Sequence, residues 1–241
     1  MADDKNPPPP KPKGSCLGKL TALFSFAGVA GLGVALYFIT QPQDLSDIKG
    51  RSSGLTAAPK ARDLRAVLQN SIDKSYPLPL TEEEINHYIR QTLATRQGGK
   101  LGTQVSLDAV SVRLEEGRAE IITERTIAGH PLTISMYVRV EQHLDVHGKT
   151  RTMIAREGGP FFPQLERTEK FAKGGRFGQL VVPQGFLLLV MPQFEKLAAL
   201  YEKELHLGFE EMSRIRIEKG KLMLDPRADG GSSMLDGGES F

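Results

Sequence analysis

The chain has 241 residues, enough for one domain with a proper core, and its 31 lysines and arginines nearly balance its 29 aspartates and glutamates. This balance argues against a phosphate-binding surface, so we expect no nucleic-acid partner. The single cysteine, Cys16, excludes an intramolecular disulfide.

Residues 1–19 are rich in proline and lysine, with four consecutive prolines at positions 7–10. This composition favours extended polyproline II backbone that cannot pack into a core. We therefore predict a disordered tail over residues 1–19.

Residues 20–40 contain no charge and no proline. A helix of this length measures about 31 Å, which matches the roughly 30 Å hydrocarbon core of a bilayer. The sequence therefore predicts a single transmembrane helix over residues 20–40.

The charges on either side of this segment differ in sign. Lys11, Lys13 and Lys19 precede it, whereas Asp44 and Asp47 follow it. The positive-inside rule then places the N-terminus in the cytoplasm and the large domain outside the cytoplasmic (inner) membrane. A cleaved signal peptide is the alternative, but the apolar run is long and lacks a small-x-small cleavage pattern, which favours an uncleaved signal anchor.

Small residues recur at four-residue spacing within this helix, at Ala27, Gly31 and Ala35. Such a stripe allows two helix backbones to approach closely, so it is a candidate face for self-association in the membrane. The alternative is a span that pairs with nothing, because glycine and alanine are common in such spans.

Residues 41–60 are polar and rich in serine, glycine and proline, which is typical of a linker. A helical stripe follows over 63–72. Thr81 and Glu84 then form a capping-box pattern and predict a helix from Glu82 to about Thr95, and this role accounts for the glutamates without catalysis.

From Val105 onward the hydrophobic period changes to two, which indicates strands. The predicted strands cover 105–114, 118–126, 132–146 and 149–156. In the third of these the even-numbered positions are apolar except for Gln142. The pattern predicts a long antiparallel meander with one apolar face that another element must cover.

The irregular segment 158–178 contains four phenylalanines, which we expect either to pack back onto the sheet or to contact a bilayer surface or a ligand. A helix is predicted from Gly185 to Leu207, bent near Pro192, as the cover for the sheet. A hairpin over 212–224 and a disordered tail over 226–241 complete the chain.

The sequence contains no recognisable active site. His143, Asp145 and His147 share one side of a strand, but same-face neighbours about 7 Å apart suit a chelate poorly, so we interpret them as a polar outer face. Neither a nucleophile elbow nor a phosphate-binding glycine loop is present. We predict no enzyme, no metal and no cofactor.

Several features together suggest a family resemblance. They are an N-terminal anchor, the helix start at 80–86 (LTEEEIN), strand pairs separated by Gly117 and Gly148, the 178–183 segment leading into a helix, and a closing hairpin at 215–224. The chain resembles the YpmS-like group of uncharacterised single-pass membrane proteins. More distantly, residues 60–225 are similar to tubular lipid-binding (TULIP-like) domains, apart from the insertion at 158–175.

The resemblance implies a highly curved sheet wrapped around a long helix and an apolar groove, and it transfers no catalytic residues. We accordingly predict an α+β domain over 61–225, a long curved antiparallel meander around a long C-terminal helix. Its predicted function is to bind a lipid or another apolar ligand between sheet and helix. The expected lining residues are Ile134, Met136, Val138 and Val140, with Phe186 and Leu189 opposite.

The same residues are compatible with a closed core. In that case the domain is an anchored scaffold or interaction subunit of a cell-envelope assembly, with protein partners and no ligand. A large apolar cavity favours the first function, whereas tight packing favours the second.

Overall fold

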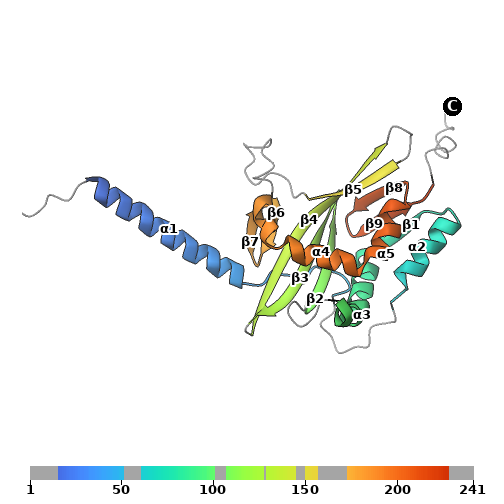
Figure 1. Ribbon diagram of the computed structural model, residues 1–241, viewed down its shortest axis with the longest axis horizontal. Helices are drawn as coiled ribbons and strands as arrows, with labels where there is room; N and C mark the ends of the chain where they lie inside the picture. Colours follow the sequence, from blue (N-terminus) through green and yellow to red (C-terminus); the bar gives the residue numbers. More distant parts are fainter. Residues whose placement is uncertain are drawn as a thin grey trace, which may run out of the picture.

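The computed structural model describes residues 16–51, 61–100, 107–127, 129–144, 150–156 and 173–227. It shows an α+β domain with two antiparallel sheets and one N-terminal apolar helix, α1 (Cys16–Thr40), which extends away from the domain (Figure 1). Residues 1–15 of the tail predicted over 1–19, most of the loop over 158–178, and the end of the chain from 228 lie outside the described residues. Residues 16–19, also predicted as tail, instead form the first turn of α1.

Helix α1 contacts the domain only near its C-terminal end. The apolar window within Gly18–Thr40 is long enough to cross a membrane, and none of it is buried against the rest of the molecule. Side chains such as Phe24 and Phe26 are exposed. This is the pattern of a single-pass membrane anchor or a signal sequence, and it excludes a buried core helix.

The larger sheet has the strand order β2-β3-β4-β6-β7, and β5 also pairs with β4. Its strands are β2 (Ala109–Glu115), β3 (Arg118–Ile127), β4 (His130–Leu144), β5 (Thr150–Arg156), β6 (Lys173–Phe177) and β7 (Leu180–Pro183). The predicted meander of β2 to β5 is confirmed, and so is the exceptional length of β4. Along one edge, residues 134–136 of β4 pair with β6 and residues 138–144 pair with β5. Two shorter strands therefore share the edge of one long strand.

The smaller sheet has the order β1-β9-β8, with β1 (Leu78–Thr81), β8 (Arg214–Glu218) and β9 (Lys221–Asp225). Two turn glycines join it to the larger sheet: the Gly117 amide donates to the Ile217 carbonyl, and the Gly220 amide donates to the Leu114 carbonyl, both at 2.9 Å. Both glycines have a φ of 75°, which glycine adopts without strain. The predicted closing hairpin is therefore confirmed, and it holds the two sheets together.

Helix α3 (Glu82–Lys100) begins with the predicted capping box, because the Glu84 amide donates to Thr81 Oγ1 at 3.2 Å. It also protects the free edge of β2. The Val112 amide donates to Asn86 Oδ1 at 2.7 Å, and the Leu114 amide donates to Glu82 Oε2 at 2.8 Å. Glu82 is thus more than a helix-start residue, since its carboxylate satisfies a strand edge.

The single long helix predicted over 185–207 is corrected by the structure. Four short segments replace it: the 3₁₀ helix η3 (Gln184–Leu189), α4 (Met191–Leu200), α5 (Glu202–Leu205) and the π-helical turn η4 (His206–Glu210). Val190 and Tyr201 interrupt the helix with φ near −115°. Pro192 lies in the first turn of α4, where its missing amide costs nothing, so it starts a new helix instead of bending an existing one.

Two large apolar clusters form most of the core, and a third, small one lies on the opposite face of the larger sheet. The first lies between the larger sheet and the η3–α4 segment, and Leu187 is its fully buried residue from η3. The second lies between the smaller sheet and the remaining helices, which include α2 (Leu64–Asp73). Arg96 of α3 ties this second cluster together: its Nη1 donates to Glu204 Oε2 at 3.0 Å, and its guanidinium lies 4.6 Å from the centre of the Tyr201 ring.

We expect Leu187→Ala to destabilise the full chain by about 2–5 kcal/mol, because it removes a fully buried side chain from a closed core. Leu188→Ala is the matched control: that side chain is 63% exposed, so its loss should change the free energy of unfolding by less than about 0.5 kcal/mol. Denaturant unfolding in detergent, followed by circular dichroism, measures both. Equal losses would contradict the assignment of the inward face.

We expect the ionised Glu204 carboxylate to stabilise the fold at neutral pH and to lose this effect in acid. Burial alone would raise the pKa of Glu204, but hydrogen bonds from Arg96 and Tyr88 outweigh burial and hold the pKa below its ordinary value. A lowered carboxyl pKa stabilises the fold above the unfolded-state value, and the stabilisation is lost as pH falls through the folded-state value.

Glu204→Gln should therefore lower the unfolding free energy at pH 7 by roughly 1.5–3 kcal/mol, and the difference from the natural chain should shrink toward pH 3. Thermal unfolding at both pH values tests this, with the exposed Glu202→Gln as control. A difference that stays constant with pH would rule out the proposed ion pair as its source.

Candidate functional site

Three of the four groove residues predicted on β4 are buried among other side chains. Ile134, Met136 and Val138 of β4 are only 7–8% exposed, and they pack in one cluster with Leu187 and Phe194. Interdigitation of this kind leaves these residues no free surface for an acyl chain. They are core residues in the described part of the chain.

The two residues expected on the opposite side of the groove do not face β4. Phe186 is 55% exposed and Leu189 is 77% exposed. In a 3₁₀ helix the side chains repeat every three residues, so the inward position of Leu187 turns Phe186 and Leu189 outward. The prediction assumed a continuous α-helix, whose period of 3.6 residues differs from that of a 3₁₀ helix. It therefore assigned Phe186 and Leu189 to the wrong face.

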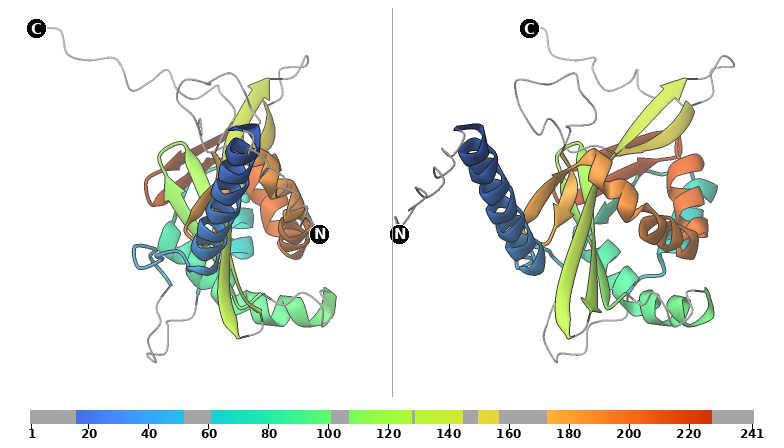
Figure 2. Two further views of the ribbon diagram at one scale, coloured as in Figure 1. Left: turned by 90° about the vertical axis from the view of Figure 1, so that its left-hand side faces the viewer. Right: turned by 60° about the vertical axis from the view of Figure 1, so that its left-hand side comes forward.

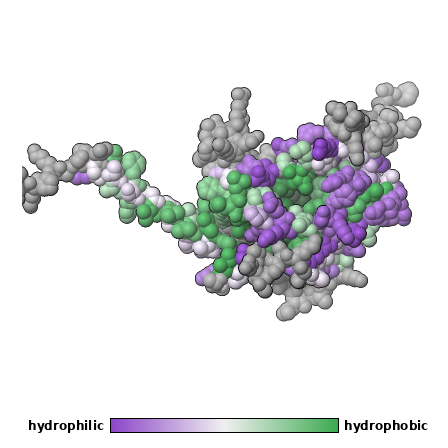
Figure 3. Space-filling model, in the orientation of Figure 1, coloured by the Kyte–Doolittle hydropathy of each residue, from purple (hydrophilic) through white to green (hydrophobic). Residues whose placement is uncertain are grey.

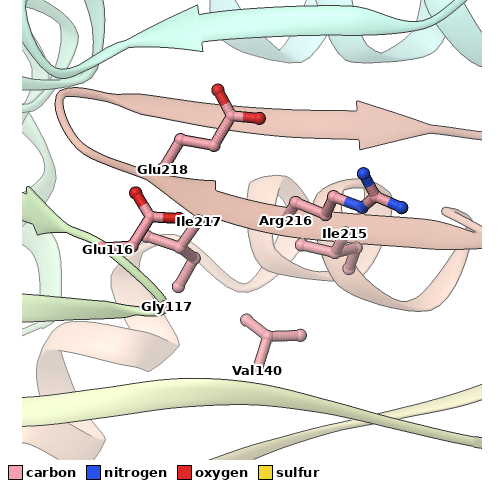
Figure 4. Close-up of a pocket in the computed structure, with 7 residues that line it drawn as sticks. All are labelled: Glu116, Gly117, Val140, Ile215, Arg216, Ile217 and Glu218. Carbon is pink, nitrogen blue, oxygen red and sulfur yellow. The ribbon is translucent and has the colours of Figure 1, made fainter.

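Val140 is the one predicted lining residue that borders a hollow. It forms the floor of an open cleft together with Ile215 and Ile217 of β8, and the cleft volume is about 320 Å³ (Figure 4). Glu116, Arg216 and Glu218 contribute polar atoms around it. Figure 4 shows the two isoleucines pointing toward Val140, while Arg216 and Glu218 lie on the other side of β8. The cleft therefore has an apolar floor, whereas the charged groups of Arg216 and Glu218 lie across β8 from Val140.

Residues 41–51, which we call the strap, were expected to be part of a linker but pack against the domain. Leu45 and Ile48 form a buried cluster with Ile122, on the face of the larger sheet opposite to η3 and α4. Backbone groups of the strap are also bonded, since the Gln43 amide donates to Thr133 Oγ1 at 3.0 Å. The first half of the predicted linker is thus part of the fold, whereas residues 52–60 lie outside the described residues.

The end of α1 is attached to the turn between β6 and β7. The Gln179 amide donates to the Phe38 carbonyl at 3.0 Å. Gly178 has a φ of 55°, and a Cβ on it would lie 2.3–2.6 Å from the carbonyl oxygens of Phe38, Ile39 and Gln41. Only glycine fits this contact, which fixes the position of α1 on the domain.

A buried polar network lies beneath the strap, centred on Glu120, which has no solvent exposure. The Ser135 hydroxyl donates to Glu120 at 2.6 Å, and Arg113 also bonds to it. Arg113 reaches the strap as well, donating to Asp47 Oδ1 at 2.8 Å. This network therefore joins the sheet to the strap through paired charges.

The same surroundings determine the charge states in the network. Burial alone would lower the pKa of Arg113, but its hydrogen bond to Asp47 and the charge of Glu120 raise the pKa above the ordinary value. Burial, followed by the charge of Glu120, raises the pKa of Tyr137. Arg113 thus stays protonated and Tyr137 stays neutral at pH 7. The ion pair that joins the sheet to the strap therefore persists at this pH.

The remaining candidates are the residues weighed as metal ligands and the small-residue stripe of α1. His143 is exposed and lies 3.5 Å from Glu141, while Asp145 and His147 lie outside the described residues. Within the described ranges, no group of three histidine, cysteine, aspartate or glutamate residues is placed to hold a metal. On α1, a Cβ added at Gly31 would meet no neighbouring atom within 4 Å, so the stripe of Ala27, Gly31 and Ala35 is open and self-association stays a prediction.

No family model matches the chain, and neither a curated protein nor a solved structure does. The resemblance to YpmS-like and TULIP-like proteins accordingly stays a prediction, and the function has to be argued from the geometry.

We expect Gly178→Ala to detach the strap from the sheet. Gly117→Ala is a matched control, because Gly117 also lies in a turn at positive φ but would meet no atom within 4 Å. Both variants bear the cost of a left-handed alanine, about 1–2 kcal/mol, whereas only Gly178→Ala also collides with the end of α1.

Hydrogen-exchange mass spectrometry of the full chain in detergent measures the difference. The backbone amides of residues 41–51 should exchange faster in Gly178→Ala and stay protected in Gly117→Ala. Unchanged protection in both variants would show that the contact between Gly178 and α1 does not hold the strap.

Proposed function

We propose that the chain is a single-pass membrane protein whose extracytoplasmic domain is an anchored, non-catalytic interaction subunit of a cell-envelope assembly. The observation that carries this proposal is the filled core. Ile134, Met136 and Val138 are covered by Leu187 and Phe194, where a lipid carrier would need a cavity of several hundred cubic ångströms. Of the two functions that the sequence allows, close packing favours the scaffold.

The attachment of α1 supports the same function. A carrier that collects and delivers ligand benefits from a flexible tether that lets the domain move. Here the strap is bonded to the sheet, and the Phe38 carbonyl is bonded to the Gln179 amide. Such a connection presents the domain in one orientation to neighbours in the same membrane, which suits a subunit better than a shuttle.

The attachment also supports an uncleaved anchor. A cut directly behind α1 would remove Phe38 and Ile39, whose carbonyl groups surround Gly178. The domain would then lose a contact that is built into its β6–β7 turn. In this proposal the N-terminus stays in the cytoplasm and the domain lies outside the inner membrane, as the flanking charges predict.

The cleft beside Val140 is the surface we propose for a protein partner. The cleft brings the partly exposed Val140 close to the charged outer side of β8, and an apolar area beside polar groups is common in interfaces. Arg216 is exposed on the outer side of β8 next to this cleft, so it can be changed without disturbing the core.

The experiment compares the natural chain with Arg216→Glu and with the control Arg65→Glu, which changes an exposed arginine on α2. Membranes from the native host are solubilised in mild detergent, and the size of the assembly that contains the chain is measured. We expect one defined complex that Arg216→Glu weakens roughly tenfold, equivalent to about 1.4 kcal/mol, and that Arg65→Glu leaves intact.

Lipid carriage is tested in parallel. The full chain is placed in donor liposomes, and transfer of a fluorescent phospholipid to acceptor liposomes is followed. An interaction subunit should not accelerate transfer over protein-free liposomes. Accelerated transfer, together with a monomeric chain in native membranes, would overturn the proposal and favour the carrier.

A further inference from the structure

The short helix η3 carries three large apolar side chains that the fold leaves exposed. Phe186, Leu188 and Leu189 are 55%, 63% and 77% exposed, while Leu187 between them is fully buried. We call these three residues the η3 patch. Adjacent exposed side chains of this size are uncommon on a soluble surface and mark a contact site.

The η3 patch lies at the end of the domain to which α1 is attached. Helix η3 follows β7 directly and packs against β6 and β7, and α1 contacts these same two strands. Figures 1 and 2 both show η3 beside the β6–β7 hairpin, on the side of the domain where α1 departs. The hydrophobic colouring in Figure 3 likewise continues from α1 onto the adjoining end of the domain.

The position of η3 relative to α1 is held by close contacts. A Cβ added at Gly174 of β6 would lie 2.4 Å from the Gln184 Cα and 2.9 Å from Leu187 Cδ1, so η3 rests directly on the β6 backbone. The turn after β6 in turn contacts the end of α1 through Gly178. Consequently, the membrane that α1 crosses also determines what the η3 patch meets.

The surrounding sequence suits lipid better than a polar partner. From Gly178 to Phe194 the chain contains no aspartate, glutamate, lysine or arginine. A protein interface usually surrounds its apolar centre with polar and charged groups. Phenylalanine and leucine are typical of the face that enters a bilayer interface, and the charge-free run around them leaves no ionised side chain to be desolvated there.

We propose that the η3 patch inserts into the outer leaflet of the membrane spanned by α1, as a second lipid contact of the domain. The inference rests on the anchored topology of the proposed function. Together with α1, the inserted patch fixes the tilt of the domain on the membrane surface.

The absence of tryptophan from the chain makes a direct test possible. A single reporter is introduced as Leu188→Trp in the full chain, which is reconstituted into liposomes of phosphatidylcholine and phosphatidylglycerol with or without lipid brominated on its acyl chains. We expect brominated lipid to lower the emission of this reporter roughly twofold, because an interfacial element buries its apolar face about 5–10 Å into the boundary between headgroups and acyl chains.

Two further single-tryptophan variants serve as a negative and a positive control for contact with lipid. Ala66→Trp places the reporter on exposed α2, at the end of the domain away from α1, and should show no quenching (Figure 1). Tyr37→Trp places it within α1 and should be quenched strongly. Circular dichroism verifies that each variant is folded.

If Tyr37→Trp is not quenched, α1 does not lie in the membrane, and the proposed function fails together with this inference. If Tyr37→Trp is quenched and Leu188→Trp is not, the anchor stands and this inference alone is overturned. In the second case, protection of Leu188→Trp from aqueous acrylamide would assign the η3 patch to a protein contact, such as a second copy of the chain.

Discussion

The attachment of α1 to the β6–β7 turn is the constraint on which the rest of the structure depends. The last carbonyl groups of any helix lack partners within the helix and need donors from elsewhere. Here the Gln179 amide supplies one of them, and Gly178 allows the backbone to approach closely enough. Because the helix ends against the sheet, the chain that follows it has to run over the sheet surface, and residues 41–51 do so as the strap.

The path of the strap explains why that face of the sheet combines apolar and charged residues. Leu45 and Ile48 cover Ile122, so part of the face must be apolar. The backbone of the strap also needs hydrogen-bond partners, and Thr133 and Glu82 provide them. The buried charge of Glu120 is balanced by Arg113, which also holds Asp47 of the strap, and by Arg176, whose Nε lies 3.7 Å from the same carboxylate.

Local patterns predicted those parts of the fold that local interactions determine. The alternation along β4, the capping box at Thr81 and the turn at Gly220 were all recognised, because each depends on residues near in sequence. The strap and strand β1 were missed. Residues 41–51 resemble a polar linker and become part of the core only through the sheet they cover, and Leu78–Thr81 contains a proline that suggests a break until β9 pairs with it.

The same reasoning explains why the predicted groove residues became core. A single straight helix across a curved sheet would touch it in the middle and leave space near its ends. The interruptions at Val190 and Tyr201 instead let short segments follow the sheet, so that Leu187, Phe194 and Leu197 each reach the interior. The irregular helix that the sequence concealed is therefore what packs Leu187, Phe194 and Leu197 against the sheet.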